Sequence, residues 1–146
     1  KQVAPALVVS NTGIIHSTRE QVSKVDLFRK RNEAEFQRIF DDYGQVHKQA
    51  LNALGSGDFD KIGMLMSRNQ QLLRDIGVSH PRAEEIIEIA IREGAYGAKV
   101  TGSGGGGAVI ALAQDPQSGR RIAEKLRVAG YESFASTIDP SGVILT

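Results

Sequence analysis

Apolar residues fall into short runs and periodic stripes that predict a mixture of strands and helices. The apolar, β-branched run at residues 3–10 precedes the turn residues NTG, which predicts a strand. Apolar residues then recur at steps of three and four, starting near Ser17 or Thr18, either of which would cap a helix. This stripe predicts one long helix that ends at Gly55 and bends near Arg31–Asn32, where the apolar positions thin out.

A second helix is predicted between Asp58, a capping residue, and Gly77. Its apolar face consists of Ile62, Leu65, Met66, Leu72, Leu73 and Ile76. Asn69 lies on the same face, and a buried amide left unpaired costs about 1–3 kcal/mol. We therefore expect the Asn69 side chain to pin a neighbouring loop, with direct ligand contact as the alternative.

A third helix is predicted from Pro81, which suits a first helical turn, to Gly94, with Ser79 or His80 as its cap. Its inward-facing residues are expected to be Ala83, Ile86, Ile87, Ala90 and Ile91. Glu84 and Glu88 share the other face at a spacing that some metal sites use. Because no third ligand lies nearby in the sequence, we expect a solvated face and no metal site.

Two apolar runs, residues 96–102 and 107–113, flank a glycine run and predict two strands. A helix from Asp115 to Gly130 follows, with Ile122, Ala123 and Leu126 pointing inward. After it, the pattern predicts an alternating strand at residues 131–138 and a short strand at 142–146. The order β-α-α-α-β-β-α-β predicts an α+β fold, with an antiparallel or mixed sheet and helices packed mainly on one face. With no linker or repeat, residues 1–146 are predicted to form one domain.

Composition excludes several classes of function. The 146 residues contain no cysteine, which excludes disulfides, thiol chemistry and cysteine-ligated zinc. Lys and Arg number 18 against 17 Asp and Glu, so the net charge of +1 gives no electrostatic footprint for nucleic acid. The densest basic run, residues 28–31, is expected to be a solvated helix face. No apolar run is long enough for a membrane span, and we expect a cytoplasmic protein.

The glycine run raises the central question about function. Gly102, Gly104 and Gly107 satisfy G-x-G-x-x-G, but a dinucleotide fingerprint needs a helix directly afterwards, and a strand follows here. The protein-kinase version sits in a hairpin and Val109 completes it, yet the V-A-I-K, H-R-D and D-F-G motifs are missing. A flexible linker is disfavoured because strands run into both ends of the loop.

A tight loop with bare backbone N–H groups remains, and such groups can cradle a phosphate or carboxylate. Lys99 and Thr101 lie on the strand that delivers the loop and share one face of it. A purely structural turn is the alternative. If the loop binds a ligand, we expect valine at Gly105 to lower turnover more than stability, because the loop lies between strands and outside the core.

Three stretches resemble a known family. AKVTGSGGGGAVIAL (residues 98–112) is similar to the third conserved motif of the GHMP small-molecule kinases. RNQQLLRDIGVSHPRAEEI (68–86) and LVVSNTGIIHSTREQV (7–22) resemble the helix-turn-helix and the threonine-bearing turn of the mevalonate kinases within that family. The order and spacing agree with the family, although Ser103 and Ala108 stand where its members usually carry alanine and cysteine.

The resemblance implies a ferredoxin-like C-terminal domain of an enzyme of isoprenoid biosynthesis. That enzyme transfers the γ-phosphoryl group of ATP to mevalonate and uses Mg²⁺. The family's phosphate loop and its catalytic Asp and Lys lie in an N-terminal half that no stretch here matches. The resemblance therefore implies that this chain contains no catalytic residue and has no activity alone. It also implies that the chain's partner is the N-terminal domain of the same enzyme. We leave open a homodimer, and expect neither nucleic acid nor membrane as a partner.

By the same resemblance, the loop would lie near the phosphates and substrate, and Thr12 would border the mevalonate side. The expected substrate- and phosphate-binding residues are Thr12, Gly102, Ser103, Gly104, Gly105, Gly106 and Gly107, supported by Asn69, Lys99 and Thr101. For Thr12, a turn hydroxyl that bonds its own backbone is the alternative. For the whole chain, the alternatives are an anion-binding module without catalysis and a GHMP kinase that acts on a related alcohol.

Overall fold

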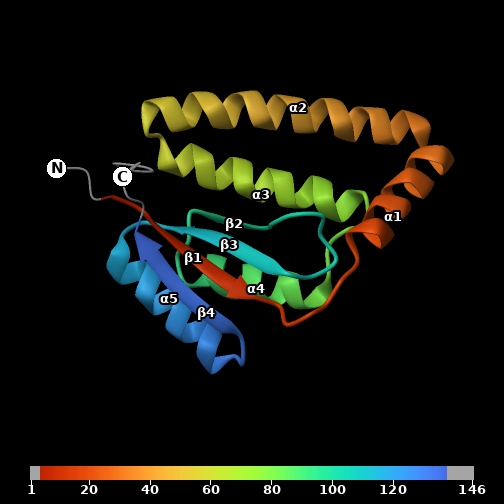
Figure 1. Cartoon of the computed structure of the whole chain (residues 1–146). Coiled ribbons are helices and arrows are strands. Elements are labelled where there is room, and N and C mark those ends of the chain that lie inside the picture. Colours follow the sequence, from red (N-terminus) through yellow and green to blue (C-terminus); the bar gives the residue numbers. More distant parts are fainter. Residues whose placement is uncertain (1–3, 138–146) are drawn as a thin grey trace, which may run out of the picture.

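The chain folds into a four-stranded sheet with helices against one face and along one edge (Figure 1). The structure, a computed structural model, describes residues 4–137. In chain order the elements are β1 (Ala6–Asn11), α1 (Thr18–Arg31), α2 (Glu33–Ser56), α3 (Phe59–Asp75), α4 (Pro81–Arg92), β2 (Gly97–Val100), β3 (Ala108–Ala113), α5 (Pro116–Val128) and β4 (Glu132–Thr137). The strand predicted at residues 142–146 lies outside the described residues.

All strand pairs in the sheet are antiparallel, in the spatial order β2-β3-β1-β4. The register aligns Ala98, Ala111, Val8 and Ala135 in one row across the sheet. This arrangement confirms the predicted α+β fold and selects the antiparallel form of its sheet. It also leaves β2 as an edge strand, with one side open for contact with a helix.

The main core lies between one face of the sheet and the helices α4 and α5. The small residues of the sheet row let both helices approach closely. The largest fully buried side chains between these layers are Val8, Val100, Val109, Ile86, Ile122 and Leu126. On α4, Ile91 is 42% exposed and Ile89 is buried, which corrects the predicted inward face. His80 caps this helix, because its Nδ1 accepts from the Arg82 backbone N–H.

The long stripe predicted as one bent helix forms two helices. Ser17 caps α1, and Asn32 leaves helical geometry with φ −139°. The Asn32 N–H donates to the Phe28 carbonyl, while its own carbonyl accepts from the Phe36 N–H. The predicted bend is therefore a complete break. The second helix ends at Ser56, with Gly57 in the left-handed conformation, and not at Gly55.

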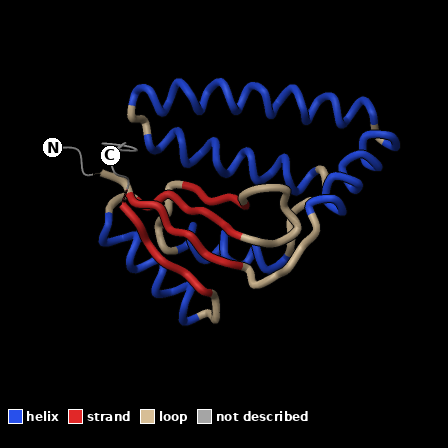
Figure 2. The backbone as a smooth tube through the Cα atoms, viewed as in Figure 1, coloured by secondary structure: helices blue, strands red, loops and turns tan. Residues whose placement is uncertain are grey.

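The helices α2 and α3 form an antiparallel pair beside the β2 edge, as Figures 1 and 2 show. A second apolar cluster, Ile39, Val46 and Leu72, joins α2 to α3. The backbone of α3 meets β2 at Gly63 and Gly97. A Cβ on either glycine would overlap the backbone of the other segment. Two glycines are therefore required for this contact. Within residues 4–137, no helix combines the length and apolar character needed to cross a membrane.

We predict that Gly63→Ala lowers the free energy of unfolding by about 1–3 kcal/mol, because the new methyl group overlaps the Tyr96 backbone. Gly44→Ala on α2 is the matched control, since a Cβ there meets nothing within 4 Å. The control should keep or raise stability, by up to about 1 kcal/mol. Chemical denaturation of both variants measures the difference. Equal stabilities would contradict a backbone contact between α3 and β2.

Candidate functional site

The loop between β2 and β3 has a backbone that requires glycine. Five of its residues have positive φ: Gly102 (65°), Gly104 (78°), Gly105 (78°), Gly106 (150°) and Gly107 (71°). Residues with a Cβ rarely adopt these conformations, whereas glycine adopts them readily. The conformation of the loop therefore explains most of the glycine run, whether or not a ligand binds there.

Three segments of the chain close around the loop. A Cβ on Gly104 would overlap the Val78 carbonyl in the α3–α4 connection, and one on Gly105 would overlap the Gln21 side chain of α1. A Cβ on Gly106 would come within 3.0 Å of Ile14, in the β1–α1 connection. Figure 2 shows this connection beside the loop. The loop thus packs against its own chain. Valine at Gly105 would meet the Gln21 side chain at a positive φ, so this change should lower stability as well as turnover.

The backbone N–H groups of the loop divide into two sets. The Gly105 N–H donates to the Val78 carbonyl at 2.7 Å, and the Gly107 N–H faces the Ile14 carbonyl at 3.4 Å. The expectation of a wholly bare loop is therefore too broad. Among residues 4–137, no acceptor pairs with the N–H groups of Gly102, Ser103, Gly104 and Gly106.

Two of these unpaired N–H groups belong to buried residues, Gly104 and Gly106. A buried N–H without an acceptor destabilises the fold by roughly 1–3 kcal/mol. An anion bound at the loop would supply acceptors for these groups. The loop is therefore suited to a phosphate or carboxylate.

Thr12 lies directly beside the loop and is fully buried. Its backbone N–H donates to the Gly107 carbonyl at 2.8 Å, and its Oγ1 accepts from the Ile14 N–H at 3.2 Å. The turn hydrogen bond that the sequence left as an alternative is thus present. The structure brings Thr12 to the loop, with its hydroxyl held by the turn.

The three supporting residues lie in different surroundings. Thr101 Oγ1 donates to the Ala108 carbonyl at 3.0 Å and closes the hairpin. Lys99 and Asn69 line a cavity of about 150 Å³ between α2, α3 and β2. The Lys99 ammonium donates to the Val100 carbonyl at 2.6 Å, and burial lowers the pKa of this amine. Asn69 has no hydrogen-bond partner within the described part of the chain, so the expected pinning role of Asn69 is wrong.

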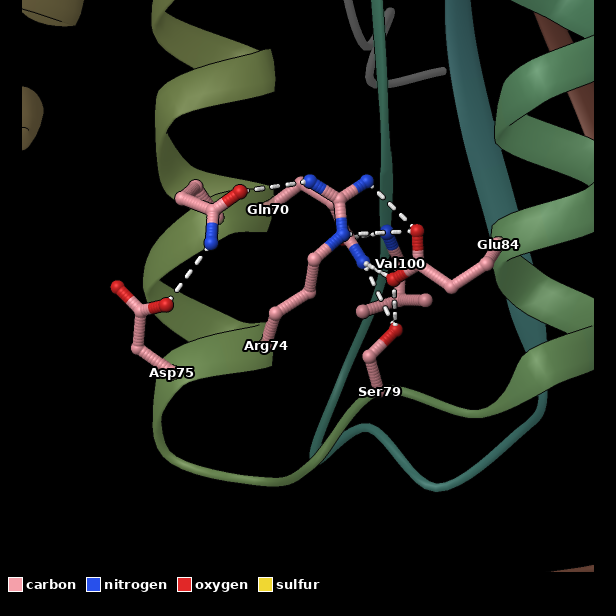
Figure 3. Close-up of polar contacts among 7 residues, drawn as sticks. Gln70, Arg74, Asp75, Ser79, Glu84 and Val100 are labelled. Atoms are coloured by element: carbon pink, nitrogen blue, oxygen red, sulfur yellow. Dashed lines mark hydrogen bonds and ion pairs between the residues drawn. The ribbon is translucent and has the colours of Figure 1, made fainter.

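The neighbouring Gln70 has the pinning role instead (Figure 3). It is 1% exposed, and its Oε1 accepts from the Val100 N–H at 3.0 Å. Its Nε2 donates to Ser79 Oγ at 2.9 Å and to Glu84 Oε1 at 2.8 Å. Gln70 thus joins α3 to the end of β2 and to the α3–α4 connection. Helical periodicity alone did not separate it from Asn69.

The Glu84 carboxylate completes this cluster, contrary to the solvated face predicted for it. Ser79 Oγ donates to Oε1, and the Arg74 guanidinium donates to Oε2 at 2.6 and 2.8 Å. Burial alone would raise the Glu84 pKa, but the hydrogen bonds from Arg74, Ser79 and Gln70 outweigh it and hold the pKa below its usual value. Glu88 is exposed, and the described residues contain no group of three metal-ligating side chains.

Gln21 is the second polar residue that the sequence analysis missed. It lies on α1 against Gly105, is 4% exposed, and its Oε1 has no hydrogen-bond partner among the described residues. Nothing in the apolar pattern singles it out, because it is a polar residue outside the apolar stripe of Val22, Val25 and Phe28. Its orphaned oxygen lies close to the glycine loop.

Comparison with known proteins identifies the class of protein to which this fold and loop belong. Residues 49–132 match the family described as GHMP kinases C terminal. The chain belongs to the GHMP kinases, as a C-terminal domain of that family.

Its most similar relatives include mevalonate kinases. The chain is 34% identical over 142 residues to one from Thermococcus gammatolerans and 35% identical over 145 residues to one from Pyrococcus furiosus. In both cases the match covers 94% of this chain and 42% of the relative, so the chain spans less than half the length of these relatives. The crystal structure of L. major mevalonate kinase in complex with R-mevalonate superposes with a TM-score of 0.89 at 34% identity, covering 97% of this chain and 44% of that one.

More distant structures show how widely the fold is shared. A Streptococcus pneumoniae phosphomevalonate kinase has a TM-score of 0.81 at 20% identity, over 93% of this chain and 40% of that one. A Lactococcus lactis galactokinase has a TM-score of 0.64 at 18% identity, over 94% and 45%. At these identities the likeness concerns the fold alone.

We predict that Gln21→Leu raises the free energy of unfolding by about 1 kcal/mol, because it removes a buried acceptor without a partner. Gln49→Leu, at an exposed position on α2, should change stability by less than about 0.5 kcal/mol. Chemical denaturation in the absence of ligands compares the two. A clear loss of stability in Gln21→Leu alone would show that the oxygen is paired in solution.

Proposed function

We propose that this chain forms the substrate side of an ATP-dependent mevalonate kinase, which phosphorylates the primary hydroxyl of mevalonate. Support comes from relatives and a solved structure of that activity at 34–35% identity over nearly the whole chain. The observation that carries the chemistry is the set of unpaired N–H groups at Gly102, Ser103, Gly104 and Gly106.

Phosphoryl transfer depends mainly on positioning and on stabilisation of charge. Fixed N–H groups stabilise phosphate oxygens effectively because they need no reorganisation during the reaction. In this chain, the closely packed surroundings of Gly104 and Gly105 hold the loop in place. The chain would therefore orient the anionic groups and form one wall of the cleft.

ATP and Mg²⁺ are the co-substrate and cofactor of this reaction class. We assign no Mg²⁺ ligand to residues 4–137, because Mg²⁺ in such sites is held largely by substrate phosphates and water. The general base and the nucleotide loop would belong to the other half of the longer enzyme. A surface for that half is available on the sheet face opposite α4 and α5, where Val9, Ile110 and Phe134 align and Phe134 is 56% exposed.

The test measures ADP release by the full-length enzyme with mevalonate, phosphomevalonate or galactose as the acceptor. We expect mevalonate to give the highest kcat/KM. We also expect Gly102→Ala to lower it at least about tenfold, equivalent to about 1.4 kcal/mol. A Cβ at Gly102 meets nothing within 4 Å among the described residues, so within this chain it would obstruct only a bound ligand.

The matched control is Gly57→Ala at the end of α2. Gly57 has φ 68° against 65° for Gly102, and a Cβ there also meets nothing within 4 Å. Both variants should lose similar stability from backbone strain, but only Gly102→Ala should lose turnover. Equal kinetics in the two variants would contradict a catalytic loop. Preference for another acceptor would identify a different GHMP kinase, and binding of phosphate without turnover would indicate an anion-binding module.

A further inference from the structure

The glycine loop is attached to the rest of the fold at two points that converge on one polar cluster. Its entry is fixed at Val100, the last residue of β2, whose N–H donates to Gln70 Oε1. Its centre is fixed at Gly105, whose N–H donates to the Val78 carbonyl. Val78 precedes Ser79, which accepts from the same Gln70 side chain.

Both attachments depend on an amide side chain at position 70. The Val100 N–H requires an acceptor, while Ser79 Oγ and Glu84 Oε1 accept from the Gln70 amino group. A carboxylate supplies only acceptors, and an apolar side chain supplies neither. Because Gln70 is buried, a lost partner cannot be replaced readily by water.

The rest of the cluster holds this amide in one orientation. Arg74 donates twice to Glu84 Oε2, which leaves Oε1 to accept from Gln70 and Ser79. The carboxylate is thus fixed from α3 and from the α3–α4 connection together (Figure 3). The position of this cluster therefore sets the position of the loop through two hydrogen bonds. One joins Gln70 to the Val100 N–H, and the other joins the Val78 carbonyl to the Gly105 N–H.

We propose that Gln70 is a positioning residue that holds the glycine loop in its working conformation through Val100 and the Ser79–Glu84 pair. Gln70 itself lies in the core, so it acts through the loop and not on a ligand. Its effect on turnover rests on the proposed kinase function, but its effect on the loop does not.

The decisive variants exchange the amide and the carboxylate in the full-length enzyme. Gln70→Glu keeps the acceptor for Val100 but places a second carboxylate beside Glu84. We expect kcat/KM to fall at least tenfold at neutral pH, and amide exchange at the two attachment points, the N–H groups of Val100 and Gly105, to accelerate at least tenfold. In the double variant Gln70→Glu, Glu84→Gln, the new amide at position 84 donates to the carboxylate at position 70. We expect this exchange to restore most of both losses.

Acid pH provides an independent test of the hydrogen bond between positions 70 and 84. A protonated carboxyl at position 70 can again donate to Glu84, so Gln70→Glu should regain activity relative to wild type as the pH falls. The charged groups around position 70 are Glu84 on α4, Arg74 on α3 and Lys99 on β2, whose ammonium reaches the Val100 carbonyl. Gln45→Glu, an exposed position on α2, adds the same charge and should show neither effect.

Loss of activity without faster loop exchange, or a double variant that folds but recovers neither property, would overturn the positioning role. Far-ultraviolet circular dichroism identifies any variant that fails to fold. For such a variant, the test passes to Glu84→Gln alone, whose single amide oxygen cannot accept from both Arg74 and Gln70. Exchange at Val100 and Gly105 should then accelerate, and unchanged exchange would contradict the positioning role. Exchange needs no substrate, so a wild-type enzyme that ignores mevalonate would contradict the proposed function alone.

Discussion

The attachment of α3 to the edge strand β2 determines how the rest of the site is built. At one end, Gly63 and Gly97 bring the two backbones into contact. At the other end, Gln70 accepts from the Val100 N–H. An edge strand exposes backbone groups that must be covered or paired, and here a helix and one buried amide cover them. The position of β2 along α3 then determines where the glycine loop begins.

The glycine loop combines two demands that the sequence does not distinguish. Its positive φ angles and its contacts with Val78, Gln21 and Ile14 require glycine for reasons internal to the fold. Its unpaired N–H groups are suited to an anion. The same backbone meets both demands, because the contacts that pair Gly105 and Gly107 also fix the directions of the remaining N–H groups. Any ligand binding at this loop would therefore be coupled to its packing.

The elements and caps were predictable because they depend on local chemistry. Asp58 and Asp115 cap their helices as expected, and the apolar stripes predicted the helices and the strands, although they left open whether the sheet is antiparallel or mixed. The break at Asn32 is stronger than the thinning stripe indicated, since Asn32 ends one helix and begins the next.

The polar contacts depend on tertiary structure and were less predictable. Asn69 and Gln70 are adjacent in sequence, and only the position of β2 decides that Gln70 is buried. Glu84 was expected in solvent because no third metal ligand lies nearby in the sequence. Its actual partners, Arg74 and Ser79, lie outside its own helix. The glycine run marked the loop, but the sequence did not show which of its N–H groups are already paired.

We propose that only part of this loop is available to an anion, and amide NMR of the full-length enzyme tests this proposal. With mevalonate and a non-hydrolysable ATP analogue, the N–H resonances of Gly102, Ser103, Gly104 and Gly106 should shift to lower field. Those of Gly105 and Gly107, which face Val78 and Ile14, should move least. Unchanged resonances across the loop, or the largest shifts at Gly105 and Gly107, would contradict this account.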